Sequence, residues 1–183
     1  MCGIAGILDN NHNFQVEELE SLVEQLKHRG PDDSGTFIEN NFGFGMRRLS
    51  ILDRELGRQP ISNEDQTKWI VFNGEIYNYV ELKAELIEKG HKFKTNSDTE
   101  TILHCYEEFG EDCPNRLQGM FAFAIWDSKE QKLFISRDRA GIKPFFYTWK
   151  NNRFVFSSEL RGLVSSTPGK LSLEGLNHYF SFL

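Results

Sequence analysis

The spacing of apolar residues divides the first part of the chain into two kinds of segment. Residues 2–8, 36–39, 42–51 and 69–72 carry continuous apolar runs or alternate apolar with polar positions, which is typical of strands. Residues 15–27 instead carry apolar side chains at helical spacing, at Val16, Leu19, Leu22, Val23 and Leu26. The pattern therefore predicts several short strands and one amphipathic helix, with residues 56–66 as a loop.

Two further helices are predicted from their start signals. Asn78 is followed by Glu81 three residues later, and Ser97 is followed by Glu100, which is the spacing of a capping box. The first of these helices ends at Gly90, and the second carries Ile102 and Tyr106 on one side. The strand at 69–72 is expected to break at Asn73-Gly74.

The composition of the chain changes after Gly119, where aromatic residues occur in short runs separated by turns. Residues 121–126, 132–137, 145–149 and 154–157 are predicted as four strands. Sheets with helices between them in the sequence predict an α+β fold, with the sheets packed on one another and the helices outside.

The C-terminal part has a different composition. Residues 163–170 are rich in Ser, Pro and Gly, as in a linker, and Ser172 begins a helix whose apolar side chains have nothing in the chain to pack on. We expect one domain over residues 1–164, followed over 165–183 by a linker and the start of a helix that leads to another domain.

Composition and charge exclude several classes of function. The 183 residues are 39% hydrophobic with a formal net charge of −6, which argues against nucleic acid and an anionic membrane surface as partners. Three cysteines form no disulfide framework, and no signal or membrane-spanning run is present. The sequence predicts a cytoplasmic protein without a metal site, because its His and Cys residues show no ligand spacing.

Cys2 is the most reactive group that the sequence offers. After removal of Met1 it carries a thiol and a free α-amine, whose pKa values of about 8.5 and 7.7–8.0 lie near neutrality. A nucleophile and its base are then present in one residue. The alternative is a small residue at the start of a buried strand.

Four other positions are candidates for binding or catalysis, each with a structural alternative. Asn73 and the Gly74 N–H can donate to an oxyanion, although Asn-Gly is also the commonest hairpin turn. Arg48 lies between apolar residues and can hold a carboxylate, or reach solvent from an edge strand. Asp98 can bind an ammonium group, or only favour the first turn of its helix. The charged turn at 137–144 is interpreted as a structural, salt-bridged loop in preference to a phosphate site.

Together, the motifs of this chain resemble those of the class II (N-terminal cysteine) glutamine amidotransferase domain, in particular the glutaminase half of asparagine synthetases. The resemblance covers about residues 2–163. It is carried by blocks in the family's order: Cys2-Gly-Ile-Ala-Gly6, His28-Arg-Gly-Pro-Asp32, Arg48-Leu-Ser-Ile51, Gln59-Pro60, Phe72-Asn-Gly-Glu-Ile-Tyr-Asn78, Ser97-Asp-Thr-Glu100, Gly119-Met-Phe-Ala-Phe123, Arg137-Asp-Arg139 with Gly141-Ile-Lys-Pro144, and Ser158-Glu159.

This resemblance implies the four-layer αββα sandwich of N-terminal nucleophile hydrolases and a role for each matching residue. Cys2 is the implied nucleophile, with its α-amine as the base, and Asn73 and Gly74 form the oxyanion hole. Arg48 is expected to bind the α-carboxylate of glutamine, and Glu75 and Asp98 its α-ammonium. Backbone groups of Leu49, Ser50, Ile51 and Leu52 are expected to line the same pocket.

The implied activity is hydrolysis of L-glutamine to glutamate and ammonia through a Cys2 thioester, with the ammonia passed to an ATP-dependent synthetase domain. That domain has a Ser-Gly-Gly-x-Asp-Ser phosphate loop, which this chain lacks, so ATP and Mg²⁺ are expected only there and no cofactor here. The partner domain is expected in cis or on another chain, and the sequence is compatible with a homodimer. The alternatives are a class II amidotransferase with another acceptor, and a non-catalytic glutamine-sensing or docking module.

Overall fold

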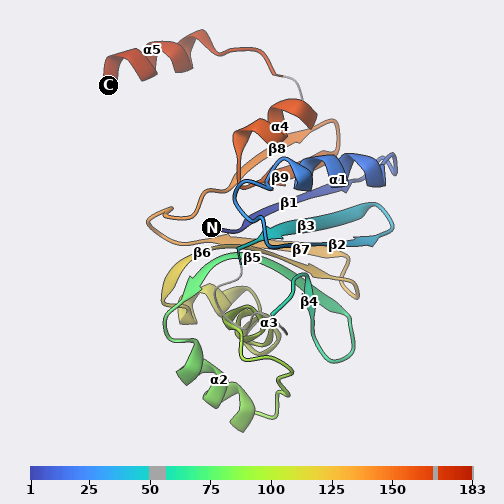
Figure 1. Cartoon of the computed structure of the whole chain (residues 1–183), viewed down its shortest axis with the longest axis vertical. Coiled ribbons are helices and arrows are strands. Elements are labelled where there is room, and N and C mark those ends of the chain that lie inside the picture. Colours follow the sequence, from blue (N-terminus) through green and yellow to red (C-terminus); the bar gives the residue numbers. More distant parts are fainter. Residues whose placement is uncertain (50–56, 167–168, 183) are drawn as a thin grey trace.

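The computed structural model describes residues 1–49, 57–166 and 169–182. Its strands form two antiparallel sheets (Figure 1). The first sheet has the order β2-β3-β1-β9-β8, with β1 (Gly3–Asp9), β2 (Asp33–Glu39), β3 (Phe42–Arg48), β8 (Phe146–Lys150) and β9 (Arg153–Ser157). The second has the order β4-β5-β6-β7, with β4 (Ile61–Ser62), β5 (Lys68–Ile76), β6 (Gly119–Asp127) and β7 (Lys132–Arg137).

The two sheets pack face to face, and their shared core is largely aromatic. Phe42 stacks on Trp126 with ring centroids 4.2 Å apart, and Phe44, Phe156 and Ile4 are fully buried beside them. The aromatic runs that the sequence assigned to strands thus fill the layer between the sheets.

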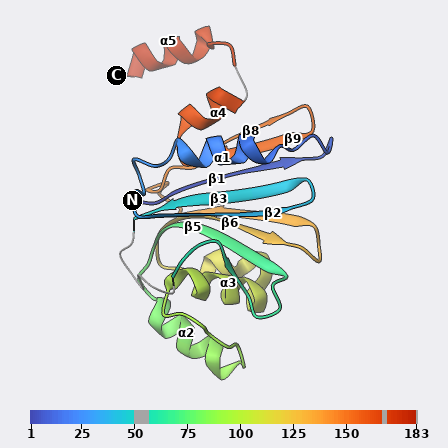
Figure 2. The same ribbon diagram turned by 45° about the vertical axis from the view of Figure 1, so that its right-hand side comes forward.

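Helices cover both outer faces, which gives four layers (Figures 1 and 2). Helix α1 (Val16–Glu24) packs Leu19, Leu22 and Val23 on the first sheet, with α4 (Leu160–Ser166) beside it. Helix α3 (Asp98–Phe109) covers the second sheet, and helix α2 (Tyr79–Glu88) and the short 3₁₀ helix η1 (Gly110–Arg116) pack against α3. The predicted α+β sandwich of αββα type is confirmed.

The two expected capping boxes have different outcomes. The Ser97 hydroxyl accepts the Glu100 N–H at 3.3 Å, as expected, but the Glu100 carboxylate reaches further back, to the N–H groups of Lys94 (2.8 Å) and Thr95 (2.7 Å). The cap at Asn78 was wrong: its side chain instead bonds the backbone of Arg116 and Gln118, which ties the start of α2 to the segment before β6.

Other expectations are corrected by long-range pairing. Strand β5 does not break at Asn73-Gly74; it continues to Ile76, because Asn73 pairs with Ala122 and Gly74 with Phe121 on β6. A two-residue strand, β4, forms within the expected loop, and α4 occupies part of the stretch interpreted as a linker.

Helix α5 (Leu173–Phe182) forms where a helix was expected and buries none of its residues. Figure 1 shows it apart from the sandwich. In the part of the chain that is described, no helix is both long and apolar enough to span a membrane.

Candidate active site

Cys2 lies immediately before β1, the central strand of the first sheet, and its backbone is firmly held. Arg29 Nε donates to the Cys2 carbonyl at 3.0 Å, and Arg29 Nη1 bonds Glu159 at 3.2 Å. The next residues are fixed through Ile4, whose N–H donates to Ser158 Oγ at 2.9 Å and whose carbonyl accepts the Ser158 N–H at 2.8 Å. The half-buried thiol lies 3.7 Å from the Leu49 carbonyl.

A cavity of about 400 Å³ opens beside this thiol. It brings together the described residues of the predicted site, which come from both sheets and from α3: Cys2, Arg48, Leu49, Asn73, Gly74, Glu75 and Asp98. Ser50, Ile51 and Leu52, predicted for the same pocket, lie outside the described residues. Met1 also lines the cavity, so an untrimmed N-terminus occupies part of it.

Asn73 offers an unused donor to this cavity. Its side chain is 1% exposed, and within the described ranges its Nδ2 has no hydrogen-bond partner. A buried amide without a protein partner is costly, so this Nδ2 is a candidate donor to a group bound in the cavity. Gly74 is required by close approach, because a Cβ there would lie 2.4 Å from the Met120 carbonyl oxygen.

Asp98 is a buried acid at the N-terminus of α3. It is 5% exposed, and its Oδ2 accepts the Ile76 N–H at 3.1 Å. Burial raises the pKa of Asp98 to about 6, against the lowering effect of the backbone hydrogen bonds, with a further rise from nearby Glu75. A cation beside Asp98 would stabilise its ionised form and offset the free-energy cost of burying the charge.

Arg48 is the last residue of β3, is 5% exposed and lines the cavity. Glu75, on β5, is exposed at the cavity's edge. The cavity therefore contains cationic and anionic groups in one space, which matches a zwitterionic ligand of amino-acid type.

Several cavity residues were not predicted from the sequence. Gln59 joins the cavity wall to both β5 and α3, since its Oε1 accepts the Phe72 N–H (2.7 Å) and its Nε2 donates to Thr99 Oγ1 (3.0 Å). Lys143 comes from the loop after β7, which was interpreted as purely structural. Both positions lie in motif blocks of the sequence, but their place in the cavity wall depends on contacts between residues distant in sequence.

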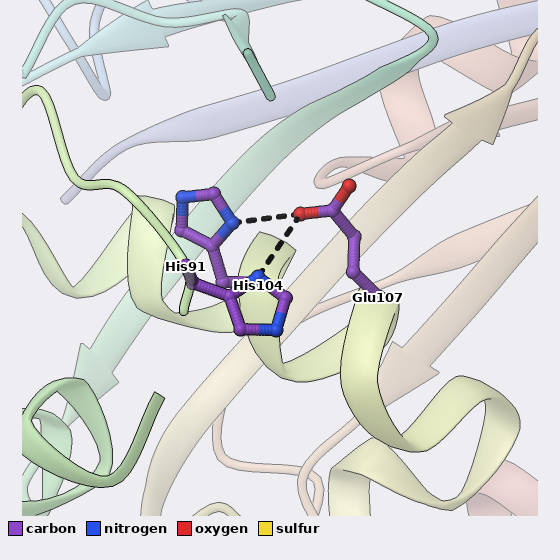
Figure 3. Close-up of side chains that lie close together, drawn as sticks. All are labelled: His91, His104 and Glu107. Carbon is purple, nitrogen blue, oxygen red and sulfur yellow. Dashed lines mark hydrogen bonds and ion pairs between the residues drawn. The ribbon is translucent and has the colours of Figure 1, made fainter. Parts of the chain in front are cut away.

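A second polar cluster, away from the cavity, contains His91, His104 and Glu107 (Figure 3). Burial disfavours a charged imidazole at His104, but Glu100 (3.7 Å) and Glu107 (2.7 Å) raise its pKa to about 9. These ion pairs hold His104, on α3, beside Glu100 and Glu107, and join α3 to His91 in the segment before it.

The fold and the cavity define a class of protein. The sandwich matches the solved glutamine phosphoribosylpyrophosphate amidotransferase from B. subtilis with a TM-score of 0.75, at 21% identity, over 88% of this chain and 43% of that one. It is thus the N-terminal nucleophile hydrolase type of fold found in glutamine amidotransferases.

The chain belongs to the glutamine amidotransferase domain family, which it matches over residues 1–183. It is 46% identical to asparagine synthetase [glutamine-hydrolyzing] 1 of Bacillus subtilis, over 100% of this chain and 30% of that protein. It is 44% identical to a putative asparagine synthetase of Methanocaldococcus jannaschii, over 90% of this chain and 35% of that protein. The chain spans about a third of the length of these relatives.

Proposed function

We propose that this chain hydrolyses L-glutamine to L-glutamate and ammonia, with Cys2 as the nucleophile after Met1 is removed. The observation that carries the proposal is that the Cys2 thiol and the unpartnered Asn73 amide line one cavity. An acyl-transfer site requires this pairing of a nucleophile with a preorganised donor for the oxyanion.

The charged residues of the cavity orient the substrate. Arg48 binds the α-carboxylate through its planar guanidinium group, and Asp98 and Glu75 bind the α-ammonium. Glutamine bound in this way directs its side-chain amide toward Cys2. The raised pKa of Asp98 supports this role, because a substrate ammonium compensates the buried carboxylate.

The chemistry then follows in two steps. The α-amine of Cys2 takes the thiol proton, and the sulfur attacks the side-chain carbonyl carbon to form a tetrahedral oxyanion. Asn73 Nδ2 and the Gly74 N–H stabilise this oxyanion. The amine returns the proton to the leaving nitrogen, so that ammonia departs and a γ-glutamyl thioester remains. Water hydrolyses the thioester to glutamate and regenerates the thiol.

We further propose that the ammonia serves an asparagine-forming synthetase domain, in cis or on another chain. Support comes from the identity of 46% to a relative named as a glutamine-hydrolysing asparagine synthetase, of which this chain corresponds to 30%. ATP and Mg²⁺ belong to that other domain, and the reaction proposed for this chain uses neither.

Glutamate release from glutamine, measured on protein whose loss of Met1 is verified by intact mass, tests the proposal. The matched control carries an N-terminal extension that blocks trimming and leaves the cavity residues unchanged. We expect turnover in the trimmed protein and none in the control, because the blocked form lacks the α-amine and its extra residues occupy part of the cavity. Glutamine binding without turnover in the trimmed protein would instead support the sensing module.

A further inference from the structure

Lys143 is a buried cation that faces the same cavity. It is 6% exposed, and among the described residues its ammonium has one hydrogen-bond partner, the thioether of Met1, 3.6 Å from Nζ. An ammonium has three donors, and a thioether is a weak acceptor. Burying a charge with so weak a partner costs free energy, unless the charge interacts with a group bound beside it.

The loop holds Lys143 in this position by a dense set of hydrogen bonds. The Asp138 carboxylate accepts the N–H groups of Lys143 (3.0 Å), Ile142 (2.8 Å) and Phe121 (3.1 Å). Arg137 Nε donates to the Lys143 carbonyl at 2.6 Å. The backbone around Lys143 is therefore fixed to β6, and its side chain is presented to the N-terminus.

The other charged groups around Cys2 have different tasks. Arg29 is bound to the Cys2 carbonyl and to Glu159. Arg48, Glu75 and Asp98 line the cavity and match the carboxylate and ammonium of the proposed substrate. Glutamine has only one α-carboxylate, which Arg48 is proposed to bind. The second cation at the cavity, Lys143, is therefore available for another role.

We propose that Lys143 is a positioning residue whose charge sets the protonation of Cys2, an inference that rests on the proposed function. When Met1 leaves, its thioether leaves with it. That thioether lies 3.6 Å from Nζ and belongs to the residue bonded directly to the Cys2 nitrogen, so Nζ lies within roughly 10 Å of the new α-amine. A positive charge there disfavours protonation of the amine and favours the thiolate.

Alkylation of Cys2 by iodoacetamide, followed against pH, tests this role without requiring turnover. Cys105 and Cys113 are both 0% exposed, so the folded, trimmed protein reports on Cys2, and Cys2→Ala gives the background. We expect Lys143→Met to move the midpoint of the rate profile up by roughly 0.5–1 pH unit. Lys143→Arg should restore the wild-type profile, and Lys150→Met, at an exposed lysine, should not change it.

Glutamine turnover provides the second measurement. The acid limb of the kcat/KM profile should move upward with the alkylation midpoint in Lys143→Met, while KM for glutamine stays within about threefold of wild type. An unmoved alkylation profile in folded Lys143→Met, and in Lys143→Gln as a second variant, would overturn the proposal. So would a raised KM with an unmoved profile, which would make Lys143 a substrate ligand. Because alkylation is independent of turnover, an inactive wild type would overturn the proposed function alone.

Discussion

The backbone N–H of Ile76 donates to the Asp98 carboxylate at 3.1 Å, which joins the end of β5 to the N-terminus of α3. This bond connects the element that carries the proposed oxyanion donors, Asn73 and Gly74, to the element that carries the buried acid of the cavity. The burial that shields this bond from water also destabilises the ionised carboxylate. It therefore raises the pKa of Asp98 to about 6.

Asp98→Asn should therefore stabilise the folded protein at pH 8. A raised folded-state pKa contributes stability below the unfolded value of 3.8 that is lost as the pH rises through about 6. The loss corresponds to at most about 3 kcal/mol, so we expect the free energy of unfolding to rise by on the order of 1–3 kcal/mol. Urea unfolding at pH 4 and pH 8 measures this, with exposed Asp112→Asn as the control. An equal effect of Asp98→Asn at both pH values would contradict the burial argument.

Arg48→Ala should weaken glutamine binding without abolishing the chemistry. Loss of a charge-assisted carboxylate bond costs about 1.5–3 kcal/mol, which corresponds to a rise in KM of roughly 10–100-fold. Steady-state kinetics against glutamine measures this, with Arg58→Ala as the control, because the Arg58 side chain is 77% exposed. An unchanged KM would remove Arg48 from the substrate site.

Asn73→Ala should lower kcat by about 10²–10³ and leave KM nearly unchanged, because the amide acts on the oxyanion and not on the bound amino acid. Exposed Asn115→Ala serves as the control. A rise in KM with normal kcat would instead place Asn73 in ground-state binding.

Glu100→Gln should lower the free energy of unfolding at neutral pH, and this loss of stability should shrink as the pH falls. Burial opposes ionisation of Glu100, but the ion pair with His104 (3.7 Å) and hydrogen bonds from Lys94 and Thr95 lower its pKa to about 2. The stability that this carboxylate contributes is present above 4.5 and is lost as the pH falls through about 2. We expect a cost of on the order of 2–3 kcal/mol at pH 7 that shrinks toward pH 2, measured by urea unfolding. Exposed Glu88→Gln should cost little at either pH, and a pH-independent cost of Glu100→Gln would contradict this account.

The sequence predicted most of the fold because periodicity and aromatic runs follow from which side chains are buried. It failed where pairing at long range overrode a local preference. Asn73-Gly74 favours a turn as a dipeptide, yet nine consecutive register pairs with β6 keep it in a strand.

The site shows the same limit. The motif blocks contain Cys2, Arg48, Asn73, Gly74, Glu75 and Asp98, and the fold places them around one cavity. Lys143 also lies in a motif block, but its approach to Met1 joins residues 142 positions apart, and no spacing rule predicts such a contact. Gln59 is comparable, because its importance lies in two hydrogen bonds to other elements.

The central claim is that Cys2 forms the bond to glutamine, and Cys2→Ala tests it most directly. Both proteins are trimmed of Met1, verified by intact mass, and assayed for glutamate release from glutamine under identical conditions. We predict turnover in the wild type and none above the no-enzyme rate in Cys2→Ala, which retains the α-amine and the other described residues of the cavity. Glutamate release by Cys2→Ala at a rate near that of the wild type would contradict the account.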